Sequence, residues 1–334
     1  MAYQLSLLDK SPVAEGENAS QALARTLLLA QKAEEWGFTR FWLAEHHNTS
    51  ALASPSPEVL IAWILAHTRS LRVGSGGVML QHYSPYKVAE NFNLLASLAP
   101  GRIDLGVGKA PGGLPLSTRA LQQGVNAEAK GDFATQLRAL DGWLTARADG
   151  EDESEDRLLA TPLPPRPAQR FLLGASEGSA QLAAELNWHF VFAAHLNGDS
   201  RELEQALETY RRLSGGQSAL VAVQVIVADS PAEADLLAAD LQHYRVQVKN
   251  GQSVTVGTLA QAEAFIRQAG ATDYQIEPRE AAIIKGTADQ VHARLEALHR
   301  RYGIEEFIID TPISSGAARI KSLELLASHR LIAA

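Results

Sequence analysis

The sequence contains no cysteine, and this absence excludes several kinds of chemistry at once. Without thiols the chain cannot form disulfides, bind metals through thiolates or use a cysteine nucleophile. An excess of positive charge is missing too, because 38 acidic residues outnumber 30 basic ones and give a formal net charge of −8. This balance disfavours unspecific binding to nucleic acids and to anionic lipid surfaces.

Long apolar runs are also missing from the 334 residues. No segment approaches transmembrane length, and the first residues, MAYQLSLLDKSP, have neither the basic start nor the apolar stretch of a signal peptide. The sequence therefore predicts a cytoplasmic protein with no nucleic acid and no membrane among its partners. G-x-S-x-G and Walker motifs are absent, which disfavours hydrolases and nucleotide phosphotransferases.

Short apolar stretches alternate with longer segments of helical periodicity, as is typical of repeated β-α units around a parallel sheet. The predicted strands are residues 3–8, 40–43, 71–80, 103–107, 171–173, 190–194, 220–227 and 307–309. Helical spacing of apolar residues is clearest in 22–35, 57–68, 88–98 and 288–301. Eight units favour a (β/α)8 TIM barrel that occupies residues 1–334 as one domain. A doubly wound open sheet shows the same alternation and stays open as a rival.

Two regions interrupt this alternation. Residues 149–167 contain the acidic run DGEDESED and the segment PLPPRP, and they predict a solvated loop before the fifth strand. Residues 241–282 predict an insertion after the seventh strand, with a helical piece at 259–269. Because an insertion after a barrel strand emerges at the catalytic mouth, this one is either a lid or substrate wall or a peripheral excursion.

The segment FWLAEHHN places Glu45, His46 and His47 just beyond the end of a predicted strand, where barrel enzymes assemble their sites. Neighbouring residues on extended backbone point to opposite sides, so His46 and His47 are not expected to bind one metal ion, and we predict no metal site. An imidazole at a barrel mouth suits proton transfer near neutral pH. A structural role is equally compatible with the residues alone.

Glycines and one lysine mark two further strand ends. Gly76 and Gly77 interrupt the predicted strand at 71–80, which indicates either a bulge, a close approach of a ligand or tight packing inside the barrel. Lys109 follows the predicted strand at 103–107 within GRIDLGVGKAPGG, whose spacing does not fit a dinucleotide fingerprint. As a cation at a strand end it could hold a phosphate or simply be solvated.

The segment GASEGSAQ joins the predicted strand at 171–173 to an amphipathic helix. Ser176, Gly178 and Ser179 at this helix start leave backbone N–H groups free to bind an anion, although plain helix capping explains the serines equally well. Glu177 would oppose an anion unless its side chain turns away.

Taken together, FWLAEHHN, RVGSGGVMLQHYSPYKVAENFNLL, PGRIDLGVGKAPGG, GASEGSAQLAAEL and KGTADQVHARL resemble the bacterial luciferase-like monooxygenase family. The resemblance implies a luciferase-like TIM barrel that binds FMN. His46 then falls at the active-site histidine of the family, and Gly76 and Gly77 fall at a non-prolyl cis peptide that lies against the flavin ring.

The same resemblance implies a phosphate site for FMN. Lys109 stands where the family usually has an arginine, which keeps the charge but loses the bidentate geometry. Ser176, Gly178 and Ser179 match the phosphate loop, whereas Ala175 replaces a carboxylate found in luciferase itself.

By the resemblance, the chain is a flavin-dependent monooxygenase that uses O2 and reduced FMN, supplied by a separate reductase, to oxygenate a small organic substrate. The family also implies a homodimer through the second and third helices, for which residues 59–65 and 92–98 offer apolar faces. Two alternatives stay open, an F420-dependent oxidoreductase and a non-catalytic flavin-binding protein.

Overall fold

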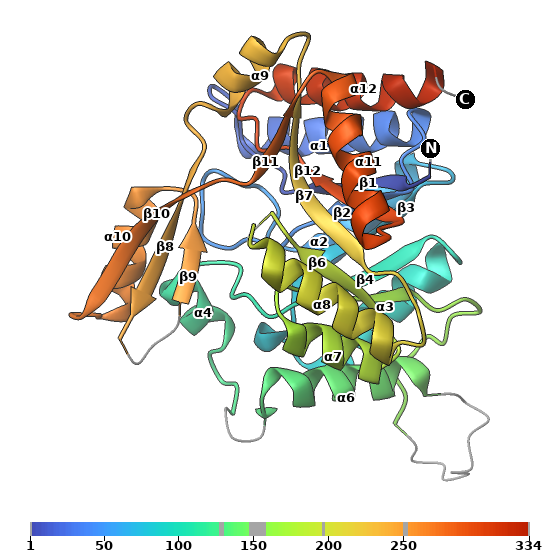
Figure 1. The fold of residues 1–334 in the computed structure, drawn as a ribbon. Coiled ribbons are helices and arrows are strands. Elements are labelled where there is room, and N and C mark those ends of the chain that lie inside the picture. Colours follow the sequence, from blue (N-terminus) through green and yellow to red (C-terminus); the bar gives the residue numbers. More distant parts are fainter. Residues whose placement is uncertain (1, 127–129, 147–157, 196–197, 250–252, 333–334) are drawn as a thin grey trace.

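The computed structural model describes residues 2–126, 130–146, 158–195, 198–249 and 253–332, and its centre is a closed barrel of parallel strands (Figure 1). The barrel strands are β1 (Gln4–Asp9), β2 (Arg40–Leu43), β3 (Arg72–Met79), β4 (Ile103–Gly108), β5 (Gln169–Gly174), β6 (His189–Ala193), β7 (Leu220–Val227) and β12 (Glu306–Asp310). Neighbours along the chain pair with one another, β7 pairs with β12, and β12 pairs back with β1. The ring has no free edge, which confirms the TIM barrel and excludes the doubly wound sheet.

Helices cover the outside of this ring (Figure 1). They are α1 (Ala19–Glu35), α2 (Pro57–His67), η1 (Leu80–His82), α3 (Pro85–Leu98), α4 (Pro115–Leu121), α6 (Phe133–Thr145), α7 (Glu177–Glu185), α8 (Ser200–Leu213), α9 (Pro231–Ala238), α11 (Ala288–Tyr302) and α12 (Gly316–Ile332). Within the described ranges, none of the helices is both long and apolar enough to cross a membrane.

Two helices begin three residues earlier than their apolar periodicity predicts, because capping rather than packing sets the start. α1 begins after a capping box in which the Asn18 side chain and Gln21 exchange hydrogen bonds. α3 begins at Pro85, a residue that suits the first turn because its missing N–H is not needed there.

Alternate residues of the strands fill the barrel in layers. The layer at the N-terminal end is ionic: Arg40 lies 2.8 Å from Glu306 and 3.0 Å from Asp104, and Arg72 also pairs with Asp104. The next layer is apolar and consists of Leu8, Trp42, Phe171, Val191, Leu220 and Ile308. These two layers fill the barrel at the N-terminal ends of the strands. A ligand can therefore approach the interior only at the C-terminal ends.

On the β3–β4 side of the barrel, consecutive glycines of β3 leave a stretch of backbone without side chains. A Cβ at Gly76 would lie 2.7 Å from Leu8 Cδ1, and one at Gly77 would lie 2.8 Å from the carbonyl oxygen of Gly106. The peptide between Gly76 and Gly77 is cis, and the register with β4 shifts between Ser75 and Val78. The bulge and the tight packing expected at these glycines are therefore both present.

The insertion stands beside α4 at one side of the barrel (Figure 1). It contains the antiparallel strands β8 (Gln242–Val248), β9 (Ser253–Val256) and β10 (Tyr274–Glu280), with α10 (Leu259–Ala269) packed on one face. Leu114, which precedes α4, joins the apolar cluster formed by Val246, Phe265 and Ile266. The short strand β11 (Ile283–Gly286) then returns to pair with β7.

The predicted loop before β5 falls partly outside the described residues, since these resume at Leu158 after the acidic run. From there to Ala168 the chain forms neither helix nor strand, as predicted, and Thr161–Pro162 is a cis X-Pro bond.

Candidate active site

Polar side chains from five strand ends meet at the mouth of the barrel. Lys10 follows β1, Asp310 ends β12, and their Nζ and Oδ2 atoms lie 2.7 Å apart. Gln224 of β7 donates from Nε2 to the same Asp310 oxygen at 3.3 Å. His46 follows β2 and His195 follows β6, and both interact electrostatically with Lys10 and Asp310.

Burial controls the protonation of this cluster. Desolvation, reinforced by the charge of Lys10, lowers the pKa of His46 and of His195 to about 4. Desolvation raises the pKa of the Asp310 carboxyl, but Lys10, His195 and Gln224 outweigh it and hold that pKa at about 2. At neutral pH the mouth therefore contains one ion pair and uncharged imidazoles.

Three polar atoms of this cluster are buried and have no hydrogen-bond partner among the described residues: His46 Nδ1, His195 Nδ1 and Gln224 Oε1. Native structures rarely leave such atoms unpaired, because each one costs about 1–3 kcal/mol. They mark the mouth as a place built for a polar ligand.

Glu45 fixes the loops around this mouth. Its side chain is fully buried, and its Oε1 accepts from Tyr83 Oη at 2.8 Å and lies 2.7 Å from His47 Nε2. Its Oε2 accepts from the backbone N–H of Met79 at 3.0 Å. The carboxylate thus ties the end of β2 to the end of β3, and it engages the ring of His47 and not that of His46.

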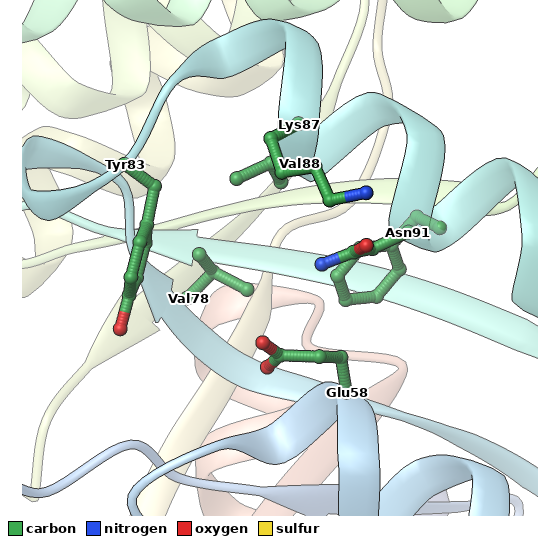
Figure 2. A pocket seen from close by; sticks show the side chains of 7 residues that line it. Glu58, Val78, Tyr83, Lys87, Val88 and Asn91 are labelled. Atoms are coloured by element: carbon green, nitrogen blue, oxygen red, sulfur yellow. The ribbon is translucent and has the colours of Figure 1, made fainter.

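Beside Tyr83 lies a small cavity of about 40 Å³ between α2, β3 and α3 (Figure 2). Glu58 of α2 points into it opposite Lys87 and Asn91 of α3 (Figure 2). Burial first, and then the nearby Glu45, raises the pKa of the Glu58 carboxyl. A cavity of this size holds a water molecule but no flavin or organic substrate, so it is separate from the barrel mouth.

A second polar corner lies where β4 and β5 end side by side, since Gly108 is in register with Leu173. Lys109 is exposed at the end of β4. Ser176 caps α7 by accepting from the backbone N–H of Ser179 at 3.3 Å, and a Cβ at Gly178 would meet no atom within 4 Å. The helix start is therefore open to an anion, with a cation on the adjacent strand.

Glu177, which could have repelled an anion, is directed to the neighbouring helix. Its Oε1 accepts from Thr209 Oγ1 of α8 at 2.9 Å and from Gln181 at 3.5 Å. The glycines of β3 and the nearby Nδ1 of His46, which has no partner among the described residues, fit the ring of FMN. The open start of α7 fits its phosphate.

Sequence reasoning missed Lys10, His195, Gln224 and Asp310. Each stands at or just beyond a strand end, which is the signal that could have found them. Within the described part of the chain, no three His, Asp or Glu side chains are grouped as a metal site would need.

Comparisons with known proteins agree with this fold. Residues 3–305 match the family described as luciferase-like monooxygenase. The chain is 42% identical to the N-acetyl-S-alkylcysteine monooxygenase of Bacillus subtilis (strain 168), over 99% of both chains. It is 35% identical to a luciferase-like monooxygenase of Escherichia coli (strain K12), over 96% of this chain and 95% of the other.

A solved structure, apo-MsnO8, superposes with a TM-score of 0.78 at 28% identity and covers 98% of each chain. The oxygenating constituent of 3,6-diketocamphane monooxygenase from Pseudomonas putida, solved with FMN, shares the fold with a TM-score of 0.68 at 19% identity over 98% of this chain and 97% of the other. The extent of these matches leaves one conclusion: the chain belongs to the luciferase-like monooxygenase family.

Proposed function

We propose that this protein is a flavin-dependent monooxygenase that oxygenates a small organic substrate with O2 and reduced FMN. The observation that carries the proposal is that Gly76 and Gly77 of β3 carry no side chains, while the uncharged His46 follows the neighbouring strand β2 with an Nδ1 that has no partner among the described residues. A flat ring can lie against the glycines while His46 faces its reactive edge.

In this proposal the chain's residues bind, orient and handle a proton. Lys109, the backbone N–H of Gly178 and the hydroxyl groups of Ser176 and Ser179 hold the FMN phosphate at the start of α7. Gly76 and Gly77 form the surface against which the ring lies. His46, neutral at pH 7, exchanges a proton with the bound reactants and acts as the catalytic residue.

Reduced FMN supplies the two electrons, so that one oxygen atom of O2 goes to the substrate and the other leaves as water. A separate NAD(P)H-dependent reductase provides the reduced flavin and is therefore a partner of this enzyme. Both proteins would work in the cytoplasm. The 42% identical relative acts on N-acetyl-S-alkylcysteines, and we propose a substrate of that kind, a small acylated thioether.

An F420-dependent oxidoreductase and a non-catalytic flavin-binding protein are the two alternatives, and they differ from a monooxygenase in the cofactor they bind or in the product they release. Titration of the apoprotein with FMN, reduced FMN and F420 should show binding of FMN, and Lys109→Gln should weaken FMN binding about tenfold while Lys109→Arg keeps or strengthens it. A preference for F420 would favour the F420-dependent oxidoreductase instead. Oxygen consumption that yields only hydrogen peroxide across a panel of substrates would indicate a non-catalytic flavin-binding protein.

A further inference from the structure

The two sides of the barrel mouth differ in chemistry. β3 and β4 are opposite β7 and β12 in the strand order, and both carry glycines towards their C-terminal ends, Gly76 and Gly77 in β3 and Gly106 and Gly108 in β4. The opposite side carries Lys10, Asp310, Gln224 and His195. If the flavin ring lies on Gly76 and Gly77 of β3, these polar groups face the substrate that binds beside the ring.

The ion pair in this polar wall presents its cation. The side chain of Lys10 is 26% exposed, whereas that of Asp310 is only 3% exposed. The Asp310 carboxylate is already occupied by Lys10 and by Gln224 Nε2. Lys10 Nζ has three donors, and its hydrogen bond to Asp310 uses one of them.

Apart from Asp310, the acidic side chains described next to Lys10 and at the mouth already have partners, since Asp9 pairs with Arg319. His195 is 7% exposed and its Nδ1 is unpartnered within the described residues, while His243 of the insertion strand β8 is half-buried and close enough to Lys10 and Asp310 to feel their charges. Glu45 is engaged by Tyr83, His47 and Met79. Among the described residues around Lys10, the free donors are therefore its own ammonium and the uncharged imidazole of His195, which favour an anionic group over a cationic one.

From this geometry we infer that Lys10 binds a carboxylate of the substrate, so that the enzyme selects acids and holds them by the wall formed by β1, β12 and β7. The inference rests on the proposed function, because it takes the mouth to be the substrate site. Asp310 and Gln224 act as positioning residues: they hold the ammonium at the mouth, and His243 brings the insertion against the same subsite.

Equilibrium binding tests this subsite without turnover. The protein loaded with oxidised FMN is titrated with N-acetyl-S-methyl-L-cysteine and with its methyl ester, which lacks the charge. We expect the acid to bind at least about tenfold more tightly than the ester, as a charge-assisted hydrogen bond implies. In Lys10→Gln the acid should lose this advantage, while the affinity for the ester changes less than twofold.

Lys10→Gln leaves the Asp310 carboxylate buried without its cation, so the double variant Lys10→Gln/Asp310→Asn is measured beside it to keep the wall neutral and folded. Lys321→Gln is the matched control, because Lys321 forms its ion pair with Asp229 and should leave both affinities unchanged. Equal binding of acid and ester to the wild type, no binding of either, or an advantage of the acid that survives in the double variant would overturn the inference.

A failure of the proposed monooxygenase activity would give a different result from a failure of the carboxylate subsite. If the acid binds through Lys10 but no oxygenated product forms with a flavin reductase, the subsite stands and the monooxygenase proposal falls. If neutral compounds are oxygenated and the acid has no advantage, the monooxygenase stands and the carboxylate subsite falls.

Discussion

Single residues at the mouth owe their chemistry to burial rather than to their type. His46 and His195 have a pKa of about 4 because the folded chain removes water from both rings. Both histidines follow a strand, but only His46 stands in a recognisable sequence motif, FWLAEHHN. Lys10 and His195 are 185 positions apart in the printed sequence, and only closure of the barrel brings the ends of β1 and β6 to the same mouth.

These depressed pKa values predict an acid-sensitive fold. The unfolded chain takes up protons on both histidines near pH 6.5, whereas the folded chain keeps them neutral down to about pH 4. The unfolded state therefore binds more protons between these limits, and the free energy of unfolding falls as the pH drops through them. From pH 7 to pH 5 each histidine should account for about 2 kcal/mol of the loss.

Urea unfolding of the wild type and of His195→Asn at pH 7, 6 and 5 measures this effect. The variant should lose about 2 kcal/mol less over the interval. His67→Asn, at an exposed position of α2, should follow the wild type. A His195→Asn variant as steep in pH as the wild type would show that this histidine does not carry the dependence.

At the scale of elements, the mouth is shaped by contacts between neighbouring strand ends. Glu45 joins β2 to β3, and the backbone N–H of His47 donates to Gly112 O at 2.8 Å, which adds the loop after β4. The glycines of β3 allow its backbone to approach that of β4 closely. The sequence indicates a special backbone at Gly76 and Gly77, but which atoms they approach depends on the partner strand.

This close approach predicts a cost for any side chain at Gly77. The added methyl group of Gly77→Ala would lie 2.8 Å from a backbone oxygen of β4, which cannot move without disturbing the ladder. We expect a loss of about 1–3 kcal/mol in the free energy of unfolding of the apoprotein.

The matched control is Gly142→Ala in α6, where a Cβ meets no atom within 4 Å. Because alanine is a better helix former, this variant should be as stable as the wild type or gain about 0.5–1 kcal/mol. Equal effects of the two substitutions in urea unfolding would contradict the packing argument.

At the scale of the whole molecule, the sequence predicts the barrel well and the insertion poorly. All eight barrel strands lie within two residues of their predicted bounds, because parallel strands buried on both faces read as apolar runs. β8 and β10, with sequences QHYRVQV and YQIEPRE, are rich in polar residues, and Pro278 lies inside a strand. Such strands carry a weak local signal, so only the α10 segment was predictable there.

We propose that the protein is the homodimer implied by the family resemblance, and its outer surface supports this proposal. Four apolar side chains of α2 and α3 are at least half exposed: Val59 (64%), Trp63 (55%), Leu94 (50%) and Leu98 (68%). Exposed apolar side chains that are grouped on neighbouring helices are typical of a protein–protein interface. Sedimentation velocity should therefore show a dimer, which Trp63→Lys/Leu98→Lys converts to a monomer.

Leu236→Lys provides the control for this surface, because Leu236 is 77% exposed on α9, outside this group of side chains. It should remain dimeric. A monomeric wild type, or a double variant that stays dimeric, would rule out an interface through α2 and α3.

In the proposed reaction, one atom of O2 is transferred to the substrate at the mouth, with His46 as the catalytic residue. The most direct measurement is mass spectrometry of the product formed from N-acetyl-S-methyl-L-cysteine under 18O2, with FMN, NADH and a generic flavin reductase. We expect product with a single 18O atom, and in His46→Ala at least about tenfold less of it with FMN affinity nearly unchanged. Unlabelled product, or an equal loss of turnover and FMN affinity in His46→Ala, would contradict it.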